Sequence, residues 1–254
     1  MQVISSKDNE IIKQIKKLKD KKYRDINNEF IIEGIKLIEE AIIEKAEIKK
    51  IIICEECASD GSIEQKLLYE IAKYDCIYVT QNIFDTLTDV KTPQGILAVV
   101  EKQNSEENID LNEDLIVVLD DIQDPGNLGT ILRTVDSANL KQIIISKGTA
   151  DPYNPKVVRS TMGAIFRVKI IESENLEKTL NEMKKNKFKI AVTSLEAKES
   201  IYDMEFVKRA IVIGNEANGV SKKVIELADE KMKIPMLRKN RKFKCFCSNR
   251  DNNI

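Results

Sequence analysis

The sequence predicts an α/β protein in two regions, a small α/β sandwich followed by a mostly parallel sheet with its helices. Short apolar runs, typical of strands buried on both faces, alternate with helical segments through both regions. A polar stretch at 103–108 without apolar periodicity separates the regions. The chain has 254 residues, of which 42% are hydrophobic and 33% charged, enough apolar material for a substantial core. We place the boundaries at 1–102, a linker at 103–113, a second domain at 114–237 and a separate tail at 238–254.

The first region opens with an amphipathic helix that carries a basic face. Ile11, Ile12, Ile15 and Leu18 recur at helical spacing. Basic residues crowd the same segment, namely Lys13, Lys16, Lys17, Lys19, Lys21, Lys22 and Arg24. Because the whole chain has a net charge of only −1, any binding of a polyanion needs such a local cluster. Taken alone, the cluster is more typical of a solvated lysine face than of an RNA contact.

The remainder of the first region alternates short strands and helices. After the segment 30–34 we expect a helix over 35–42, a strand over 51–53, a helix near 64–73, and strands over 77–79 and 96–100. This order makes a small α/β sandwich.

The second region begins with the apolar run 115–119, which predicts a buried strand. A turn and a helix start follow it, with the sequence Asp124-Pro125-Gly126-Asn127-Leu128-Gly129-Thr130-Ile131-Leu132-Arg133-Thr134. Glycines allow the backbone a tight turn, and Asn127 and Arg133 supply polar and cationic groups beyond it. Open α/β sheets place ligand sites in such strand–turn–helix segments, although a plain connection has the same local chemistry.

Two further segments strengthen the case for a site. The strand 210–213 runs into Gly214-Asn215-Glu216-Ala217-Asn218-Gly219-Val220-Ser221, which puts a carboxylate at the end of a second buried strand. A third strand is expected over 233–236, and between the first two segments lies Pro155-Lys156-Val157-Val158-Arg159-Ser160-Thr161-Met162-Gly163-Ala164. No G-x-G-x-x-G pattern is present, which disfavours an ordinary dinucleotide-binding fold.

These segments resemble the signature motifs of the SpoU (TrmH-type) RNA methyltransferases. The resemblance implies a knotted methyltransferase domain that transfers a methyl group from S-adenosylmethionine to a ribose 2′-hydroxyl of RNA, and a homodimer as in intact members. The first region, through Lys21-Lys22-Tyr23-Arg24 and Phe30-Ile31-Ile32-Glu33-Gly34, resembles the RNA-binding accessory domain of many such enzymes. That pairing favours ribosomal RNA as the substrate.

The resemblance also implies roles for particular residues. The catalytic set is Arg133, Asn127 and Glu216, although Glu216 is also explained as a charge partner of a helix N-terminus. The family pattern assigns activation of the ribose hydroxyl to Arg133. Arginine is effectively never deprotonated in proteins, so Arg133 is instead expected to anchor the neighbouring phosphate and stabilise the alkoxide, with that phosphate or Glu216 taking the proton. Contacts to the cofactor, chiefly through the backbone, are implied for Thr193, Ser194, Gly214, Asn215, Gly219, Ile234 and Met236. Contacts to RNA are implied for Lys21, Lys22, Arg24 and Arg159.

The residue content excludes some catalytic schemes and disfavours a metal site. It contains no histidine, which excludes histidine-based acid–base and nucleophilic schemes. Of its five cysteines, Cys54 and Cys57 have zinc-knuckle spacing and Cys245 and Cys247 form a second pair, yet buried or idle thiols explain them better than a metal. We therefore expect no metal. Neither a signal peptide nor a membrane span is apparent, so we expect a cytoplasmic protein with no membrane partner.

The tail departs from the resemblance. After Leu237, the family pattern calls for Ser-Leu-Asn opening an apolar helix that threads the knot and packs the dimer, whereas residues 238–254 are strongly basic. One codon string that encodes this tail reads GKTESLNVSVATGIII when shifted by one base. We therefore hypothesise a one-base slip of the reading frame near Leu237, which leaves the knot incomplete. Two alternatives stay open: a non-catalytic RNA-binding remnant of such an enzyme, and a transfer-RNA ribose methyltransferase.

Overall fold

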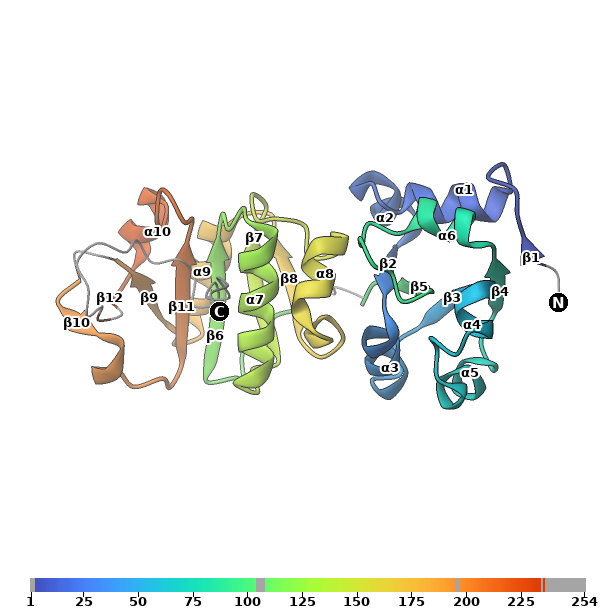
Figure 1. Ribbon diagram of the computed structural model, residues 1–254. Coiled ribbons are helices and arrows are strands. Elements are labelled where there is room, and N and C mark those ends of the chain that lie inside the picture. The colour runs from blue at the N-terminus through green and yellow to red at the C-terminus, as the bar shows by residue number, and fades with distance from the viewer. Residues whose placement is uncertain (1–2, 104–107, 195–196, 234, 236–254) are drawn as a thin grey trace, which may run out of the picture. The chain divides into compact units, whose positions relative to one another are not determined.

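A computed structural model describes residues 3–103, 108–194, 197–233 and 235 (Figure 1). Its contacts divide the chain into two compact units. The first unit comprises Met1–Gln103 with Tyr153–Phe166, and the second Asn104–Pro152 with Arg167–Ile254. The segment 153–166, which the sequence analysis placed in the second domain, therefore packs within the first unit. Each unit is described by itself.

The first unit is built on a mixed five-stranded sheet with the order β1-β4-β3-β5-β2. Its strands are β1 (Val3–Ile4), β2 (Glu29–Glu33), β3 (Ile48–Cys54), β4 (Cys76–Val79) and β5 (Ile96–Glu101). Strand β4 runs parallel to β1 and β3, whereas β5 runs antiparallel to β2 and β3. The predicted strands over 51–53, 77–79 and 96–100 are all present.

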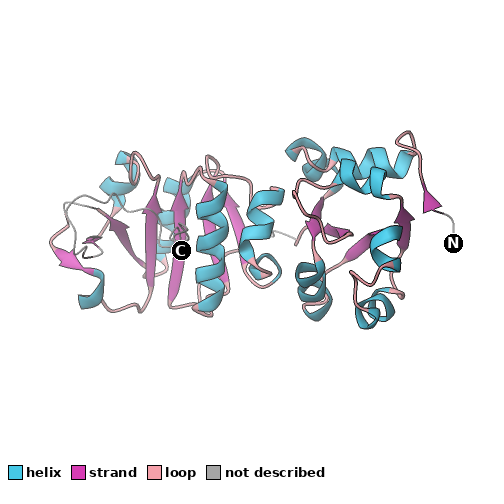
Figure 2. Cartoon of the chain, in the orientation of Figure 1, coloured by secondary structure: helices cyan, strands magenta, loops and turns pink. Residues whose placement is uncertain are grey.

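The helices of this unit are drawn in cyan in Figure 2. They are α1 (Glu10–Lys17), α2 (Lys21–Asn27), α3 (Ile35–Ile43), α4 (Glu55–Ser59), α5 (Gln65–Ile71), α6 (Gln81–Leu87), α8 (Pro155–Thr161) and the 3₁₀ turn η1 (Ala164–Phe166). The apolar stripe of α1 forms one core with α6 and the sheet, in which Ile12, Ile15 and Phe84 are buried. Helix α8 packs against β2.

The basic segment forms two helices, not the single one that the sequence predicted. Helix α1 ends at Lys17, and Leu18 is its C-cap. Asp20 then caps α2, because its carboxylate accepts a hydrogen bond from the Lys22 backbone N–H at 3.0 Å. Aspartate is a strong N-cap residue, so it starts a new helix at this point.

The second unit contains a seven-stranded sheet in which every neighbouring pair of strands is parallel. The order is β10-β12-β9-β11-β6-β7-β8. The strands are β6 (Leu115–Asp120), β7 (Gln142–Ser146), β8 (Lys169–Ser173), β9 (Lys189–Thr193), β10 (Glu199–Ser200), β11 (Arg209–Gly214) and β12 (Glu230–Lys233). The predicted parallel sheet is confirmed, but β12 begins three residues before the predicted strand 233–236.

The helices of this unit are α7 (Pro125–Ser137), α9 (Leu176–Lys185), α10 (Lys222–Leu227) and the 3₁₀ turn η2 (Ile201–Asp203). Leu180 and Met183 of α9 and Val224 of α10 are buried in one cluster with strand residues such as Val118 and Val212, so both helices cover the same face. The tail 238–254, on which the predicted knot and the frame-slip hypothesis depend, lies outside the described residues.

Candidate active site

The candidate site lies where the strand order of the parallel sheet reverses. From β6 the chain builds outward through β7 and β8, whereas β9 and β11 lie on the opposite side of β6. Strands β6 and β11 are direct neighbours, with Gly214 opposite Asp120. Because ligands of open α/β sheets bind outside the carboxyl ends of the strands at such a switch point, the two motif loops meet at the expected place.

The first loop leads from β6 into α7 through a capped turn. Asp121 adopts a positive φ of 62°, and its backbone N–H donates to the Ser146 hydroxyl at 2.8 Å. Asp124 is the N-cap of α7, and its carboxylate accepts from the Asn127 backbone N–H at 2.8 Å. Proline at the first helical position suits a helix start, since its missing N–H would have no helical partner there. The cap fixes Asn127 in the first turn of α7.

The two loops are joined by a hydrogen bond between predicted catalytic residues. The Asn127 side-chain amide donates to Glu216 Oε1 at 2.7 Å, across 89 positions of sequence. Both side chains are half-buried. A hydrogen bond to a carboxylate is stronger than one between neutral groups, so this contact orients Glu216 at the switch point.

The second loop, 214–221, is held in shape by its own side chains and by β6. The Asn215 amide donates to the Asp121 carbonyl at 2.8 Å, and its oxygen accepts from the backbone N–H groups of Ala217 and Asn218. The Ser221 N–H donates to the Asp120 carboxylate at 2.7 Å. Asn215 is only 7% exposed. Its side chain therefore positions the loop, and a cofactor contact at this residue would come from its backbone.

Arg133 does not join the Asn127–Glu216 pair. It follows Asn127 by six residues on α7, which at about 100° per residue places the two side chains about 120° apart around the helix. The Arg133 side chain is exposed, and none of the described residues hydrogen-bonds or ion-pairs with its guanidinium. The structure leaves this cation available to an anionic ligand.

The predicted cofactor contacts gather at the ends of two neighbouring strands. Thr193 ends β9, and its hydroxyl donates to the Val212 carbonyl of β11 at 3.3 Å. The Ser194 N–H, next along the chain, donates to the Met232 carbonyl at 2.9 Å. Gly214 ends β11. Ile234 and Met236 lie outside the described residues.

Two glycines leave the backbone of the second loop uncovered, as recognition of a cofactor through the backbone requires. A Cβ on Gly214 would lie 2.1 Å from the Val220 nitrogen, so only glycine lets the loop fold back onto the strand end. Gly219 has a φ of 72°, and a Cβ there would have no atom within 4 Å. This exposed turn leaves open space beside the strand ends, and no side chain of Gly219 occupies it.

Among the predicted RNA contacts in the first unit, Arg24 requires a correction. It is only 2% exposed, and its Nη1 donates to the carbonyls of Leu18 and Lys19, each at 2.8 Å. The guanidinium therefore satisfies carbonyl groups at the end of α1 and does not face RNA. Lys21 and Lys22 are exposed, as an RNA contact requires.

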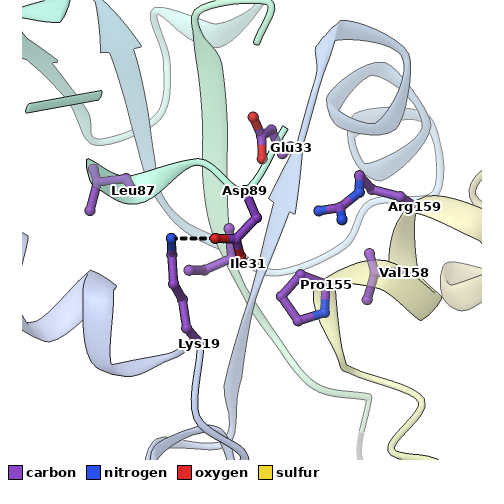
Figure 3. Close-up of a pocket in the computed structure, with 8 residues that line it drawn as sticks. All are labelled: Lys19, Ile31, Glu33, Leu87, Asp89, Pro155, Val158 and Arg159. Atoms are coloured by element: carbon purple, nitrogen blue, oxygen red, sulfur yellow. Dashed lines mark hydrogen bonds and ion pairs between the residues drawn. The ribbon is translucent and has the colours of Figure 1, made fainter. Parts of the chain in front are cut away.

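Arg159 points into a shallow pocket of the first unit, shown in Figure 3. The pocket is lined by Lys19, Ile31, Glu33, Leu87, Asp89, Pro155, Val158 and Arg159. Lys19 is neutralised there, since its ammonium group ion-pairs with Asp89 at 2.8 Å. No such partner is present for the Arg159 guanidinium among the residues that the structure describes. Its predicted role in RNA binding is compatible with this environment.

Two aspartates that organise the site were missed by the sequence analysis. The Asp120 carboxylate accepts a hydrogen bond from the Ser221 N–H of the second loop, and the backbone carbonyl of Asp121 accepts one from the Asn215 amide. Their position directly after the buried run 115–119 was a usable signal, because polar residues at a strand's carboxyl end face the switch point.

The cysteine motif of the first unit belongs to its core. Burial raises the pKa of the Cys54 thiol to about 12. Both Cys54 and Cys57 have Gln81 Oε1 as a hydrogen-bond acceptor, at 3.1 and 3.8 Å. A neutral thiol is a poor zinc ligand, because the thiolate is the ligating form. Within 3–103, 108–194 and 197–233 no three metal-ligating side chains are grouped, and no helix there is long and apolar enough to cross a membrane.

Two family comparisons match the two parts of the chain. Residues 114–243 match the SpoU rRNA methylase family, and residues 9–98 match the MRM3-like substrate-binding domain. The chain belongs to the SpoU rRNA methylase family. It is thus a methyltransferase that acts on RNA and uses S-adenosylmethionine.

Relatives along nearly the full length agree with this assignment. The chain is 32% identical over 237 residues to the 23S rRNA (guanosine(2553)-2′-O)-methyltransferase RlmP of Bacillus subtilis, covering 93% of this chain and 91% of that protein. It is 28% identical to the S-adenosylmethionine-bound rRNA methyltransferase of Sinorhizobium meliloti, with a TM-score of 0.80 over 94% of this chain and 91% of that one. A TrmH-family RNA methyltransferase structure from Porphyromonas gingivalis is 26% identical, with a TM-score of 0.78 over 91% and 90% of the two chains.

Proposed function

We propose that this protein methylates a ribose 2′-hydroxyl of ribosomal RNA. The hydrogen bond between Asn127 and Glu216 carries the proposal, since it places a carboxylate of fixed orientation at the switch point of the sheet. Support for ribosomal RNA comes from the relative in Bacillus subtilis, which is named as a 23S rRNA 2′-O-methyltransferase. The MRM3-like substrate-binding match over 9–98 supports an RNA-binding role for the first unit.

The chemistry requires removal of a proton from a weak nucleophile. When bound, S-adenosylmethionine supplies a methyl group that is electrophilic because it is attached to a sulfonium. The ribose oxygen gains the methyl group and loses its proton, which we assign to Glu216. Oε1 of this carboxylate accepts from Asn127, and no described residue hydrogen-bonds to Oε2. Oε2 is therefore the oxygen that receives the proton.

Arg133 serves this reaction through its charge. A guanidinium stays protonated in proteins and matches a phosphate through two parallel hydrogen bonds. Its exposure and lack of a described partner suit a contact with the RNA phosphate next to the target ribose. From there its positive charge also favours the developing alkoxide electrostatically.

Assembly and location are part of the same proposal. We infer a homodimer for the frame-restored chain, as the family resemblance implies, and a cytoplasmic location, where the proposed ribosomal RNA substrate is found. Light scattering of the purified frame-restored chain measures the first, and cell fractionation the second. A frame-restored chain that is monomeric at micromolar concentration would contradict the dimer.

The proposed function is tested by mapping ribose methylation in cellular RNA with and without this gene. A single 2′-O-methyl mark that disappears from ribosomal RNA on deletion, and returns with the gene, is the expected result. Complementation with the chain as it stands and with the frame-restored chain tests the frame-slip hypothesis separately. A mark lost from transfer RNA, with ribosomal RNA unchanged, would overturn the substrate assignment.

A further inference from the structure

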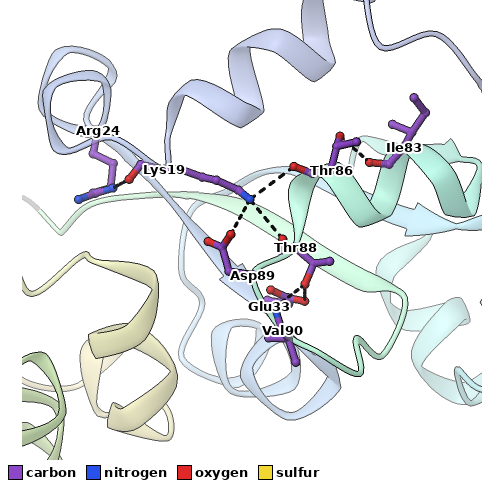
Figure 4. Close-up of polar contacts among 8 residues, drawn as sticks. All are labelled: Lys19, Arg24, Glu33, Ile83, Thr86, Thr88, Asp89 and Val90. Carbon is purple, nitrogen blue, oxygen red and sulfur yellow. Dashed lines mark hydrogen bonds and ion pairs between the residues drawn. The ribbon is translucent and has the colours of Figure 1, made fainter.

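The turn between α1 and α2 is held rigidly by two cations that act inside the fold. Lys19 donates to the carbonyls of Thr86 and Thr88 and to the Asp89 carboxylate, at 3.4, 3.2 and 2.8 Å (Figure 4). Four residues into α2, Arg24 donates to the carbonyls of Leu18 and Lys19. The turn is therefore anchored to the loop after α6 on one side and to the end of α1 on the other.

Tyr23 lies between these anchors and is itself only half-buried. The Lys17 and Lys22 ammonium groups lie over its ring, at 5.5 and 5.9 Å from the ring centroid. None of the described residues hydrogen-bonds to its hydroxyl group. One turn further along α2, Ile26 is 66% exposed, and residues three apart share a helix face. An aromatic ring and an aliphatic side chain thus form an exposed apolar surface between lysines.

We propose that Tyr23 is a stacking residue for an unpaired RNA base, with Lys17 and Lys22 binding the phosphates on either side of it. This inference rests on the proposed function, because it assumes that the first unit binds RNA. Proteins that hold single-stranded RNA combine a positively charged path for the backbone with aromatic rings on which bases stack. The ammonium groups over the ring are carried on flexible side chains, so an incoming base can displace them from the ring toward its own phosphates.

The rigid turn makes the ring a suitable binding group. Ordering a loop on binding costs conformational entropy, whereas a ring presented on a fixed turn avoids much of that cost. Arg24 and Lys19 supply this rigidity and are not available as ligands. The chemistry selects unpaired nucleotides, because a base within a duplex has no free face for the ring.

The test measures binding of a short single-stranded RNA of mixed sequence, and of the same strand annealed to its complement, without S-adenosylmethionine. Tyr23→Ala is expected to weaken single-strand binding by about 5- to 150-fold. The slope of log affinity against log salt should stay unchanged, since the substitution leaves every phosphate-binding cation in place. Tyr23→Phe should bind like the unmodified chain. Replacing Lys17 and Lys22 by Ala should reduce the slope by about 0.7 for each phosphate that is no longer neutralised.

Tyr74 provides a matched control within the same unit. It too is half-buried, and Lys73 lies over its ring at 5.4 Å. Tyr74→Ala is expected to leave RNA binding unchanged, and thermal unfolding of each variant verifies the fold. Equal affinities for Tyr23→Ala and the unmodified chain, an equal weakening on the duplex, or a weakening with Tyr23→Phe would each overturn the proposal. Because the assay involves no methyl transfer, a chain that binds RNA through Tyr23 without methylating it contradicts only the proposed function.

Discussion

Helices α2 and α7 both begin at an aspartate cap and carry an arginine, but the two arginines serve opposite purposes. Each helix is capped by an aspartate, Asp20 or Asp124, and each carries an arginine further along. Arg24 is 2% exposed and bonds to two carbonyl groups, whereas Arg133 is exposed and has no described partner. The first arginine stabilises the fold, and the second remains available to a ligand.

The difference follows from where the preceding helix ends. Helix α1 stops directly before α2, so its final carbonyls lie within reach of Arg24, and unsatisfied carbonyls at helix ends need donors. Helix α7 follows a strand, whose carbonyls are paired with neighbouring strands, and no described carbonyl accepts a hydrogen bond from the guanidinium of Arg133. A basic residue in an RNA-binding motif therefore indicates RNA contact only when its side chain is not already hydrogen-bonded to nearby backbone carbonyls.

The largest expected effect concerns Arg133. In the frame-restored chain, Arg133→Ala should lower kcat for methyl transfer by about 10²–10³-fold, the usual decrease when one electrostatic donor is removed. The free energy of unfolding should stay unchanged, because the Arg133 guanidinium makes no hydrogen bond or ion pair with a described residue. Methyl-transfer kinetics and urea unfolding measure the two quantities. Loss of S-adenosylmethionine affinity with kcat preserved would assign Arg133 to the cofactor.

The converse is expected for Arg24. Arg24→Ala leaves buried carbonyl acceptors without a donor, so the free energy of unfolding should fall by about 2–3 kcal/mol. Lys22→Ala, an exposed cation on the same helix, is the matched control and should leave stability unchanged. Urea unfolding followed by circular dichroism measures both. A stable Arg24→Ala variant with weakened RNA binding would restore RNA contact as the role of this residue.

Much of the second unit was predictable from sequence, because its strands are buried on both faces and appear as unbroken apolar runs, such as 115–119 and 210–213. The site pair Asn127 and Glu216 followed from motif resemblance, but their contact required the order of strands, which no local pattern contains. Arg24 was misassigned because its burial depends on where α1 ends. The sequence analysis gave Tyr23 no role of its own, because a local pattern does not show how far a side chain on a helix is exposed.

The next prediction concerns the hydrogen bond from Asn127 to Glu216, which we expect to orient the carboxylate that accepts the proton. Asn127→Ala removes a hydrogen bond to a charged group, worth about 1.5–3 kcal/mol, so kcat should fall by about 10–100-fold. Glu216→Gln should lose more activity, since an amide cannot accept the proton. If Glu216 were only a charge partner of the α7 N-terminus, Glu216→Gln would lower the free energy of unfolding and leave kcat intact.

The smallest effect concerns Arg209, a half-buried arginine whose charge is used by the fold, like that of Arg24. Its Nε and Nη2 donate to Glu230 Oε2 and Oε1 at 2.8 and 3.0 Å, joining the starts of β11 and β12. The hydrogen bond from Arg209 holds the pKa of Glu230 below its ordinary value of 4.5. A carboxyl group whose pKa is lowered by folding stabilises the protein above its unfolded pKa, and this contribution is lost as the pH falls through the folded pKa.

The free energy of unfolding should therefore decline below about pH 4.5, and the Arg209–Glu230 pair should account for about 1 kcal/mol of this decline at most. Glu230→Gln should remove that component of the pH dependence, while Glu226→Gln, an equivalent change on α10, should retain it. A pH dependence unaltered by Glu230→Gln would show that the ion pair contributes no stability, and that arginine pairing in this fold matters only where the guanidinium is buried.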